Sequence, residues 1–198
     1  MTLDLPIPAA LHMSLPDGGA RRLEELAALL DERGVPLGLV SHRDRERIWE
    51  RHILDCLRVA AEVGVEDRDA YDLGSGAGLP GLVVAIARPD LAVGLVEVRR
   101  RRAAFLELAI ERMEIANARV IVGRVEDPRN PVDVCFARAL APLTESWRLA
   151  VPLLRPGGRL VYFAGKVRAP RSLPGASRVR IVASSVLESG GPLVIMTR

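Results

Sequence analysis

The segment that decides the fold is a glycine-rich stretch, Tyr71-Asp72-Leu73-Gly74-Ser75-Gly76-Ala77-Gly78-Leu79-Pro80-Gly81. An apolar run at 70–73 comes before the glycines, and a run with helical character at 80–87 comes after them. Glycine permits a tight turn and a close approach of the backbone to a ligand. The stretch therefore predicts a nucleotide-binding loop between a strand and a helix.

Outward from this loop, predicted strands and helices alternate. Strands are expected at 91–96, 119–122, 132–137 and 159–164, with helices at 99–115 and 144–154, the last stopped by Pro156-Gly157-Gly158. Two final runs, 179–186 and 192–197, predict an antiparallel closing pair. The alternation predicts an α/β fold with a doubly wound, Rossmann-like sheet, in which ligands lie beyond the carboxyl ends of the strands.

The residues before this pattern predict a short N-terminal helical extension. Residues 1–17 contain several prolines and predict a loose arm, and apolar spacing predicts helices at 20–33 and 44–63. We therefore expect two parts. Residues 67–198 are expected to form the ligand-binding domain, and residues 1–66 an arm and helices packed on it.

Composition limits the class of protein. The 198 residues are 49% apolar and contain no run of about 18 apolar residues, so no membrane span or membrane partner is expected. The N-terminus lacks the charge pattern of a signal peptide. Cys56 and Cys135 show no pairing pattern, which predicts free thiols and a cytoplasmic location. A net charge of +3 permits an anionic partner without requiring one.

The spacing of the loop indicates its ligand. A dinucleotide loop needs Gly-x-Gly-x-x-Gly, and Gly74 and Gly76 match, but Leu79 stands where the third glycine belongs. The pattern is instead Asp-x-Gly-x-Gly-x-Gly, from Asp72 to Gly78. A carboxylate here would repel a pyrophosphate and favour a ligand with an ammonium group and no phosphate. S-adenosylmethionine is such a ligand; the alternative is a purely structural turn.

Two further segments extend this predicted site. Glu97 ends the second strand, 25 residues after Asp72, where a carboxylate can accept hydrogen bonds from both ribose hydroxyls. Gly123-Arg124-Val125-Glu126-Asp127 follows the third strand, where backbone N–H groups can hold an adenine edge. The alternatives are a surface glutamate and a solvated turn.

Three residues are candidates for catalysis. Arg138 ends the fourth strand, where it could anchor a donor carboxylate or a base edge, or be one more surface arginine. His52 and Asp55 share a helix face, which fits either catalysis or a helix-packing hydrogen bond. No set of metal ligands is evident. Cys135 lies within a predicted strand and is expected in the core. S-adenosylmethionine donates a methyl group, and some methyl acceptors must first be deprotonated by a base. A ring nitrogen such as guanine N7 needs no deprotonation, so the lack of an obvious base is compatible with a ring nitrogen as the methyl acceptor.

Four motifs together resemble the glucose-inhibited division protein B (RsmG/GidB) family, whose members are guanine-N7 methyltransferases of 16S ribosomal RNA. They are Glu50-Arg51-His52-Ile53-Leu54-Asp55, the glycine loop, Gly123-Arg124-Val125-Glu126 and Ala137-Arg138-Ala139-Leu140-Ala141-Pro142-Leu143, within roughly residues 40–165. The resemblance implies a class I methyltransferase sheet and S-adenosylmethionine as methyl donor. It places donor binding at Gly74, Leu79, Val125, Glu126 and Arg138, with Glu97 as the ribose-binding acid.

The resemblance also implies a partner, ribosomal RNA or the small ribosomal subunit, and we expect a monomer. Arg43, Arg45, Arg47, Arg51 and Arg99–Arg102 would meet phosphates, although the last four also fit a solvated helix face.

Departures from the family pattern fall on the acceptor side. The usual Trp-Asn segment is absent from 33–41, and Lys166 stands one place late. A small-molecule methyltransferase and a diverged donor-binding paralog without rRNA methylation therefore stay open.

Overall fold

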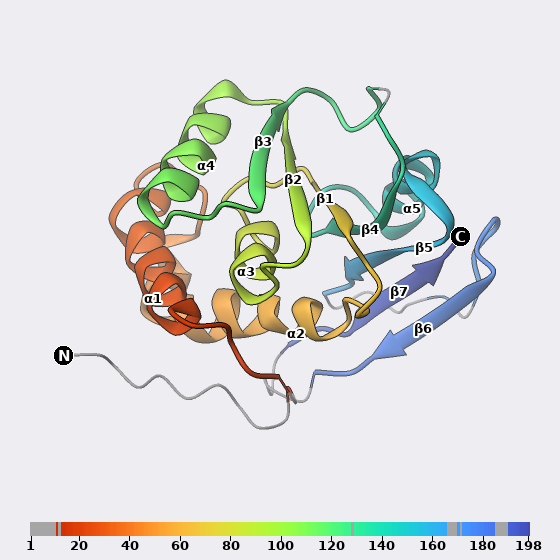
Figure 1. Ribbon diagram of the computed structural model, residues 1–198, viewed down its shortest axis with the longest axis horizontal. Helices are drawn as coiled ribbons and strands as arrows, with labels where there is room; N and C mark the ends of the chain where they lie inside the picture. The colour runs from red at the N-terminus through yellow and green to blue at the C-terminus, as the bar shows by residue number, and fades with distance from the viewer. Residues whose placement is uncertain (1–10, 12, 128, 166–169, 171, 185–189) are drawn as a thin grey trace.

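A seven-stranded sheet forms the centre of the molecule (Figure 1). The computed structural model describes residues 11, 13–127, 129–165, 170, 172–184 and 190–198. The strands are β1 (Asp69–Leu73), β2 (Ala92–Glu97), β3 (Ala118–Val122), β4 (Val132–Ala137), β5 (Leu154–Phe163), β6 (Arg178–Val182) and β7 (Leu193–Thr197). Their order is β3-β2-β1-β4-β5-β7-β6. The first five strands are parallel, and β7 runs antiparallel between β5 and β6, as predicted for the closing pair.

Helices cover both faces of the sheet. They are α1 (Gly19–Leu29), α2 (Asp55–Ala61), α3 (Gly81–Ala87), α4 (Arg100–Arg112) and α5 (Leu143–Ala150). Buried residues of α1 to α4 form one hydrophobic cluster with one face of the sheet, and α5 contributes to a second cluster on the other face. The sides alternate along β4, where Phe136 belongs to the first cluster and Cys135 to the second.

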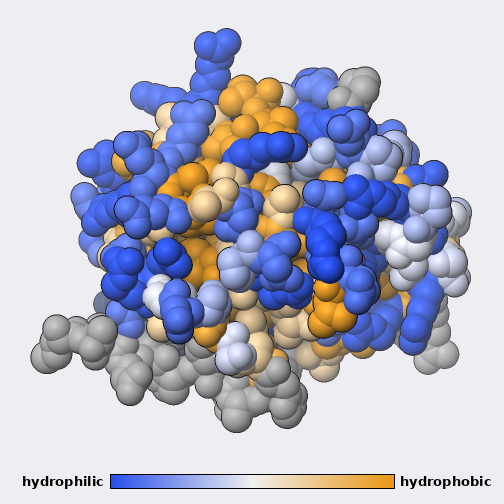
Figure 2. Space-filling view, viewed as in Figure 1, coloured by the Kyte–Doolittle hydropathy of each residue, from blue (hydrophilic) through white to orange (hydrophobic). Residues whose placement is uncertain are grey.

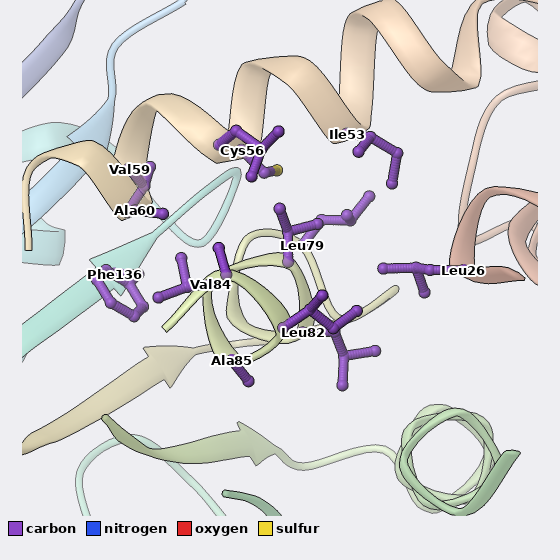
Figure 3. Packing of buried hydrophobic residues seen from close by; sticks show 14 of the residues in the cluster. Leu26, Ile53, Cys56, Val59, Ala60, Leu79, Leu82, Val84, Ala85 and Phe136 are labelled. Atoms are coloured by element: carbon purple, nitrogen blue, oxygen red, sulfur yellow. The ribbon is translucent and has the colours of Figure 1, made fainter. Parts of the chain in front are cut away.

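The helix after the glycine loop is completely enclosed. All seven residues of α3 are buried. Figure 3 shows the reason: α3 lies below α2, and its Leu82, Val84 and Ala85 are surrounded by side chains from several elements, including Phe136. A helix that is apolar all round is stable only in such surroundings. This packing fixes the start of α3, and with it the loop.

The N-terminal helices are less regular than expected. The expected helix at 20–33 is α1 followed by a π-helical turn, η2 (Leu30–Gly34). The expected helix at 44–63 is a 3-10 turn, η3 (His42–Arg47), then a π-helical turn, η4 (Trp49–Leu54), then α2. A π turn adds one residue to the helical repeat, which an apolar pattern with the ordinary helical period does not reveal.

The prediction for the residues before β5 was wrong. Helix α5 ends at Ala150, a 3-10 turn η5 (Val151–Leu153) follows, and β5 begins at Leu154, so Pro156-Gly157-Gly158 lies within the strand. The register between β4 and β5 shifts here. Val132 pairs with Leu154, but Val134, two residues later, pairs with Arg159, which is five residues later on β5. A Cβ at Gly158 would lie 3.0 Å from the Asp133 carbonyl oxygen. The glycine therefore permits the bulge rather than stopping a helix.

Cys56 and Cys135 are free and buried, and Cys135 is a core residue as predicted. Across the part of the chain that the structure describes, no helix is long and apolar enough to cross a membrane. The face in Figure 2 is largely hydrophilic, with scattered hydrophobic patches. Lys166 and residues 185–186 of the run expected at 179–186 lie outside the described residues.

Candidate functional site

The glycine loop connects β1 to α3, as predicted, and its conformation requires glycine. Gly74, Gly76 and Gly78 have φ of 71°, 55° and 81°, in the left-handed region that favours glycine. The backbone N–H groups of Gly74 and Ser75 both donate to the Val96 carbonyl oxygen, at 2.9 and 3.0 Å. The loop is thus fastened to the end of β2.

Glu97 joins the loop to the next strand. Its side chain is buried, and Oε2 accepts a hydrogen bond from Gly76 N at 3.0 Å while Oε1 accepts one from Arg99 N at 2.8 Å. A carboxylate has about four lone-pair sites, so each oxygen retains one for a ligand. The backbone therefore holds Glu97 in one orientation, with acceptor capacity to spare.

A cavity of about 260 Å³ lies beside Glu97. It is lined by Gly74, Val96, Glu97, Val98, Gly123, Arg124, Val125, Glu126, Leu140, Ala141, Glu145 and Leu149. The cavity brings together four residues predicted from the sequence: Gly74, Glu97, Val125 and Glu126. Its apolar wall, including Val98, Leu140 and Leu149, was missed. Two of these residues carried a signal in the sequence: Val98 directly follows Glu97, and Leu140 belongs to the motif that begins at Ala137.

Four predicted residues support the loop without lining this cavity. Asp72 is 1% exposed, and its Oδ2 accepts a hydrogen bond from Gly81 N at 3.1 Å. Burial raises its pKa to about 7. The carboxylate lies beneath the loop, at the start of α3, and not in the cavity wall. Leu79 packs into the first hydrophobic cluster, and Gly76 and Gly78 form the turn itself.

Arg138, which follows the end of β4, is the centre of a separate group of polar contacts, the Arg138 group. Its Nη1 donates to Cys56 Sγ at 3.1 Å, and its Nη2 donates to the Arg51 carbonyl oxygen at 3.1 Å. Its guanidinium carbon lies 5.0 Å from the centre of the Phe163 ring. These contacts hold the guanidinium between the N-terminal helices and β5.

The structure brings the other two catalytic candidates to the same arginine. His52 Nδ1 lies 3.1 Å from Arg138 Nη2, and Asp55 Oδ2 lies 3.6 Å from it. The other oxygen of Asp55, Oδ1, accepts a hydrogen bond from the buried Arg58 at 2.7 Å. Asp55 therefore shares its negative charge between two arginines.

The protonation state of His52 follows from these contacts. Arginine can only donate, so Nδ1 accepts and the ring proton of the neutral imidazole lies on Nε2. Burial, and then the charge of Arg138, lower the pKa of His52 to about 4. Nε2 is buried and has no hydrogen-bond partner within the described residues; Asp44 Oδ2 is 3.8 Å away. At neutral pH, His52 is therefore uncharged and accepts a hydrogen bond from Arg138, so it is not available as a base.

The cavity beside Glu97 and the Arg138 group lie at the same edge of the sheet, where the parallel strands end. Gly74, Val98 and Arg138 directly follow β1, β2 and β4, which are neighbouring parallel strands. The carboxyl ends of such strands are where open α/β sheets bind ligands. The edge therefore combines a nucleoside-sized cavity with an arginine held by several contacts.

Known proteins are similar to this chain both in sequence and in fold. Residues 20–175 match the family described as rRNA small subunit methyltransferase G. The chain is 42% identical over 174 residues to Ribosomal RNA small subunit methyltransferase G of Thermobifida fusca, covering 85% of this chain and 73% of the relative. It is 45% identical over 166 residues to the Salinispora tropica protein of the same name, covering 79% of this chain and 64% of that protein.

A solved structure gives the fold independently. The O-methyltransferase TomG from Streptomyces achromogenes, in complex with SAM, superposes with a TM-score of 0.61 at 19% identity, covering 96% of this chain and 92% of that one. At this identity the likeness concerns the fold alone. It confirms the expected class I methyltransferase sheet.

Proposed function

Because the chain belongs to the rRNA small subunit methyltransferase G (GidB) family, we propose that it transfers a methyl group from S-adenosylmethionine to guanine N7 in 16S ribosomal RNA. The family identified from four motifs is confirmed, and the match extends beyond the motifs to residues 20–175.

The observation that carries the proposal is the fixed carboxylate of Glu97 in the wall of an otherwise largely apolar cavity. Its two oxygens suit the two hydroxyls of a ribose, and Val98, Val125 and Leu140 offer apolar surface for an adenine ring. A Cβ at Gly74 would lie 2.8 Å from Leu140 Cδ1, so the loop and this wall are already in close contact. These residues fit an adenosyl group.

The donor supplies an electrophilic methyl group on a sulfonium. The residues of the protein would hold the donor and the methyl acceptor in the orientation that the transfer needs. Glu97 would hold the ribose, and Val125 and Glu126 would hold the adenine. Asp72 would act from beneath the loop, through the negative charge it presents towards the donor's ammonium group. Gly76, Gly78 and Leu79 would keep the loop in shape. Proximity and orientation can provide most of the acceleration of such a transfer.

Arg138 would act on the acceptor side. Three of its N–H groups contact Cys56, Arg51 and His52, which leaves two of the five for a base edge or the donor carboxylate. Guanine N7 attacks with its own lone pair and needs no deprotonation. A neutral His52 that cannot serve as a base is compatible with that acceptor, and we assign it and Asp55 to holding Arg138.

The free positive charge next to this edge favours an RNA partner. Arg99, Arg100 and Arg101 are exposed at the start of α4, and none has an ion-pair partner among the described residues. By contrast, Arg45, Arg47 and Arg51 pair with Asp31, Glu50 and Asp44. We propose that phosphates of the RNA contact the first group. Residues 1–66 would contribute to the acceptor side through the contacts with Arg138, and the protein would act as a cytoplasmic monomer.

The test is methylation of RNA that lacks the modification. The protein is incubated with radiolabelled S-adenosylmethionine and either 16S RNA or small subunits from a methyl-deficient strain, and the labelled base is mapped. We expect label on one guanine at N7, none with Glu97→Gln, and full incorporation with Glu111→Gln, an exposed control on α4. Label on a small molecule instead, or donor binding without any labelled RNA, would replace the proposal with one of the alternatives.

A further inference from the structure

The loop after β3, residues 123–127, accepts several hydrogen bonds from one buried side chain, that of Arg129. The Arg129 side chain is 8% exposed. Its Nη1 donates to the carbonyl oxygens of Val125 and Asp127, at 3.1 and 2.8 Å, and its Nη2 donates to that of Arg124 at 2.6 Å. Its Nε is buried and finds no partner among the described residues, so all of the hydrogen bonds of this guanidinium go to the loop.

Two neighbours complete this arrangement. Asp127 Oδ2 accepts a hydrogen bond from Arg124 N at 2.7 Å and lies 3.7 Å from Arg129 Nη2. A Cβ at Gly123 would lie 2.6 Å from that carboxylate oxygen and 3.2 Å from the guanidinium. The glycine at this position therefore leaves room for the Asp127–Arg129 pair.

The direction of the carbonyl groups determines the direction of the N–H groups. In a planar trans peptide, the C=O of one residue and the N–H of the next point in opposite directions. Because the carbonyls of Arg124 and Val125 point at Arg129, the N–H groups of Val125 and Glu126 point away from it. Both residues line the cavity beside Glu97, and neither N–H has a backbone or side-chain partner in the described part of the chain.

We propose that Arg129 is a positioning residue that sets the nucleobase specificity of this cavity for adenine. The inference rests on the proposed function, since it assumes an adenosyl group in the cavity. Adenine N1 is an acceptor and can receive a backbone N–H, whereas N1 of hypoxanthine carries a hydrogen and would oppose it. An N–H group whose direction is fixed distinguishes the two bases; one that is free to turn does so poorly.

Calorimetric titration tests this proposal. S-adenosylhomocysteine and its deaminated analogue, S-inosylhomocysteine, are titrated into wild type, Arg129→Met, Arg129→Lys and Arg148→Met. Arg148 is the matched control, because its side chain is 71% exposed on the neighbouring α5. We expect wild type to prefer the adenine compound. R129M should bind it roughly tenfold or more weakly, because three hydrogen bonds from a charged donor are lost.

The ratio of the two dissociation constants is the decisive measurement. It should fall towards unity in R129M, take an intermediate value in R129K, whose ammonium cannot reach all three carbonyls, and stay at the wild-type value in R148M. A wild-type ratio in a folded R129M, even with weaker binding overall, overturns the inference. If R129M does not fold by circular dichroism, the ratio in R129K decides in the same way. Failure of wild type to bind either compound would instead refute the proposed function.

Discussion

Arg138 Nη2 donates a hydrogen bond to Nδ1 of His52 over 3.1 Å, between residues 86 positions apart in the chain. The bond connects the end of β4 to the π-helical turn η4. It also selects the imidazole tautomer, and the arginine's positive charge helps to keep the ring neutral. The contact therefore couples the packing of the N-terminal helices to the electrostatics of the proposed acceptor site.

The stability of the protein should fall in mild acid because of His52. Its pKa is about 4 when folded against 6.5 ordinarily, so the unfolded chain binds this proton more readily. The contribution is complete above pH 6.5 and is lost as the pH falls towards 4, by up to about 3 kcal/mol. Urea denaturation of wild type and His52→Gln across this range measures it, because glutamine accepts from Arg138 without titrating. Exposed His42, changed to Gln, is the control; an H52Q profile as steep as that of wild type would refute the assignment.

Replacing Arg138 should affect stability and catalysis differently. Arg138→Met leaves the partners of the arginine unpaired and should cost about 2 kcal/mol of unfolding free energy. Arg138→Lys keeps the charge and should recover part of that stability, but it lacks the planar fork, so methyl transfer should stay at least about 100-fold reduced. Unfolding curves and single-turnover methylation separate the two effects. Transfer near the wild-type rate in R138K would exclude a directional role for the guanidinium.

Asp72→Asn should stabilise the protein while weakening donor binding. The pKa of Asp72 is about 7 when folded, so ionising this buried acid costs stability as the pH rises from about 4 to about 7. D72N should therefore be more stable than wild type at pH 8, by up to about 4 kcal/mol, and the difference should vanish near pH 4. Donor affinity at pH 8 should fall about tenfold, because the charge facing the ammonium is gone. An unchanged dissociation constant would show that the charge does not act on the ligand.

Binding of RNA should depend less on salt once the free arginines are removed. Each phosphate contact contributes roughly 0.7 to 0.9 to the slope of log K against log salt. Changing Arg99, Arg100 and Arg101 together to Ser should lower the magnitude of that slope by about 2 to 3. The control changes Arg21, Arg33 and Arg148, which are exposed but near Glu25, Glu32 and Glu145. Equal slopes in the two triple variants would place the RNA elsewhere.

Much of the proposed donor site could be predicted, because its residues are close to one another in the sequence. A strand, three glycines and a helix follow one another directly, and the period of apolar residues identifies the strands around them. Glu97 was found for the same reason, since it ends the next strand. The apolar walls were not found, because Leu140 and Leu149 come from segments that only the order of the strands brings to Glu97.

The sequence by itself determined the alternation of strands and helices, the glycine turn and its acidic partner, since these depend on near neighbours and on side-chain periodicity. Tertiary structure alone decided that Asp72 lies beneath the loop, that Arg138 meets His52 and Asp55, and that Arg129 holds the loop after β3. The reason is physical: burial and hydrogen bonding depend on which segments pack together, and distant segments meet only when the sheet and its helices have assembled.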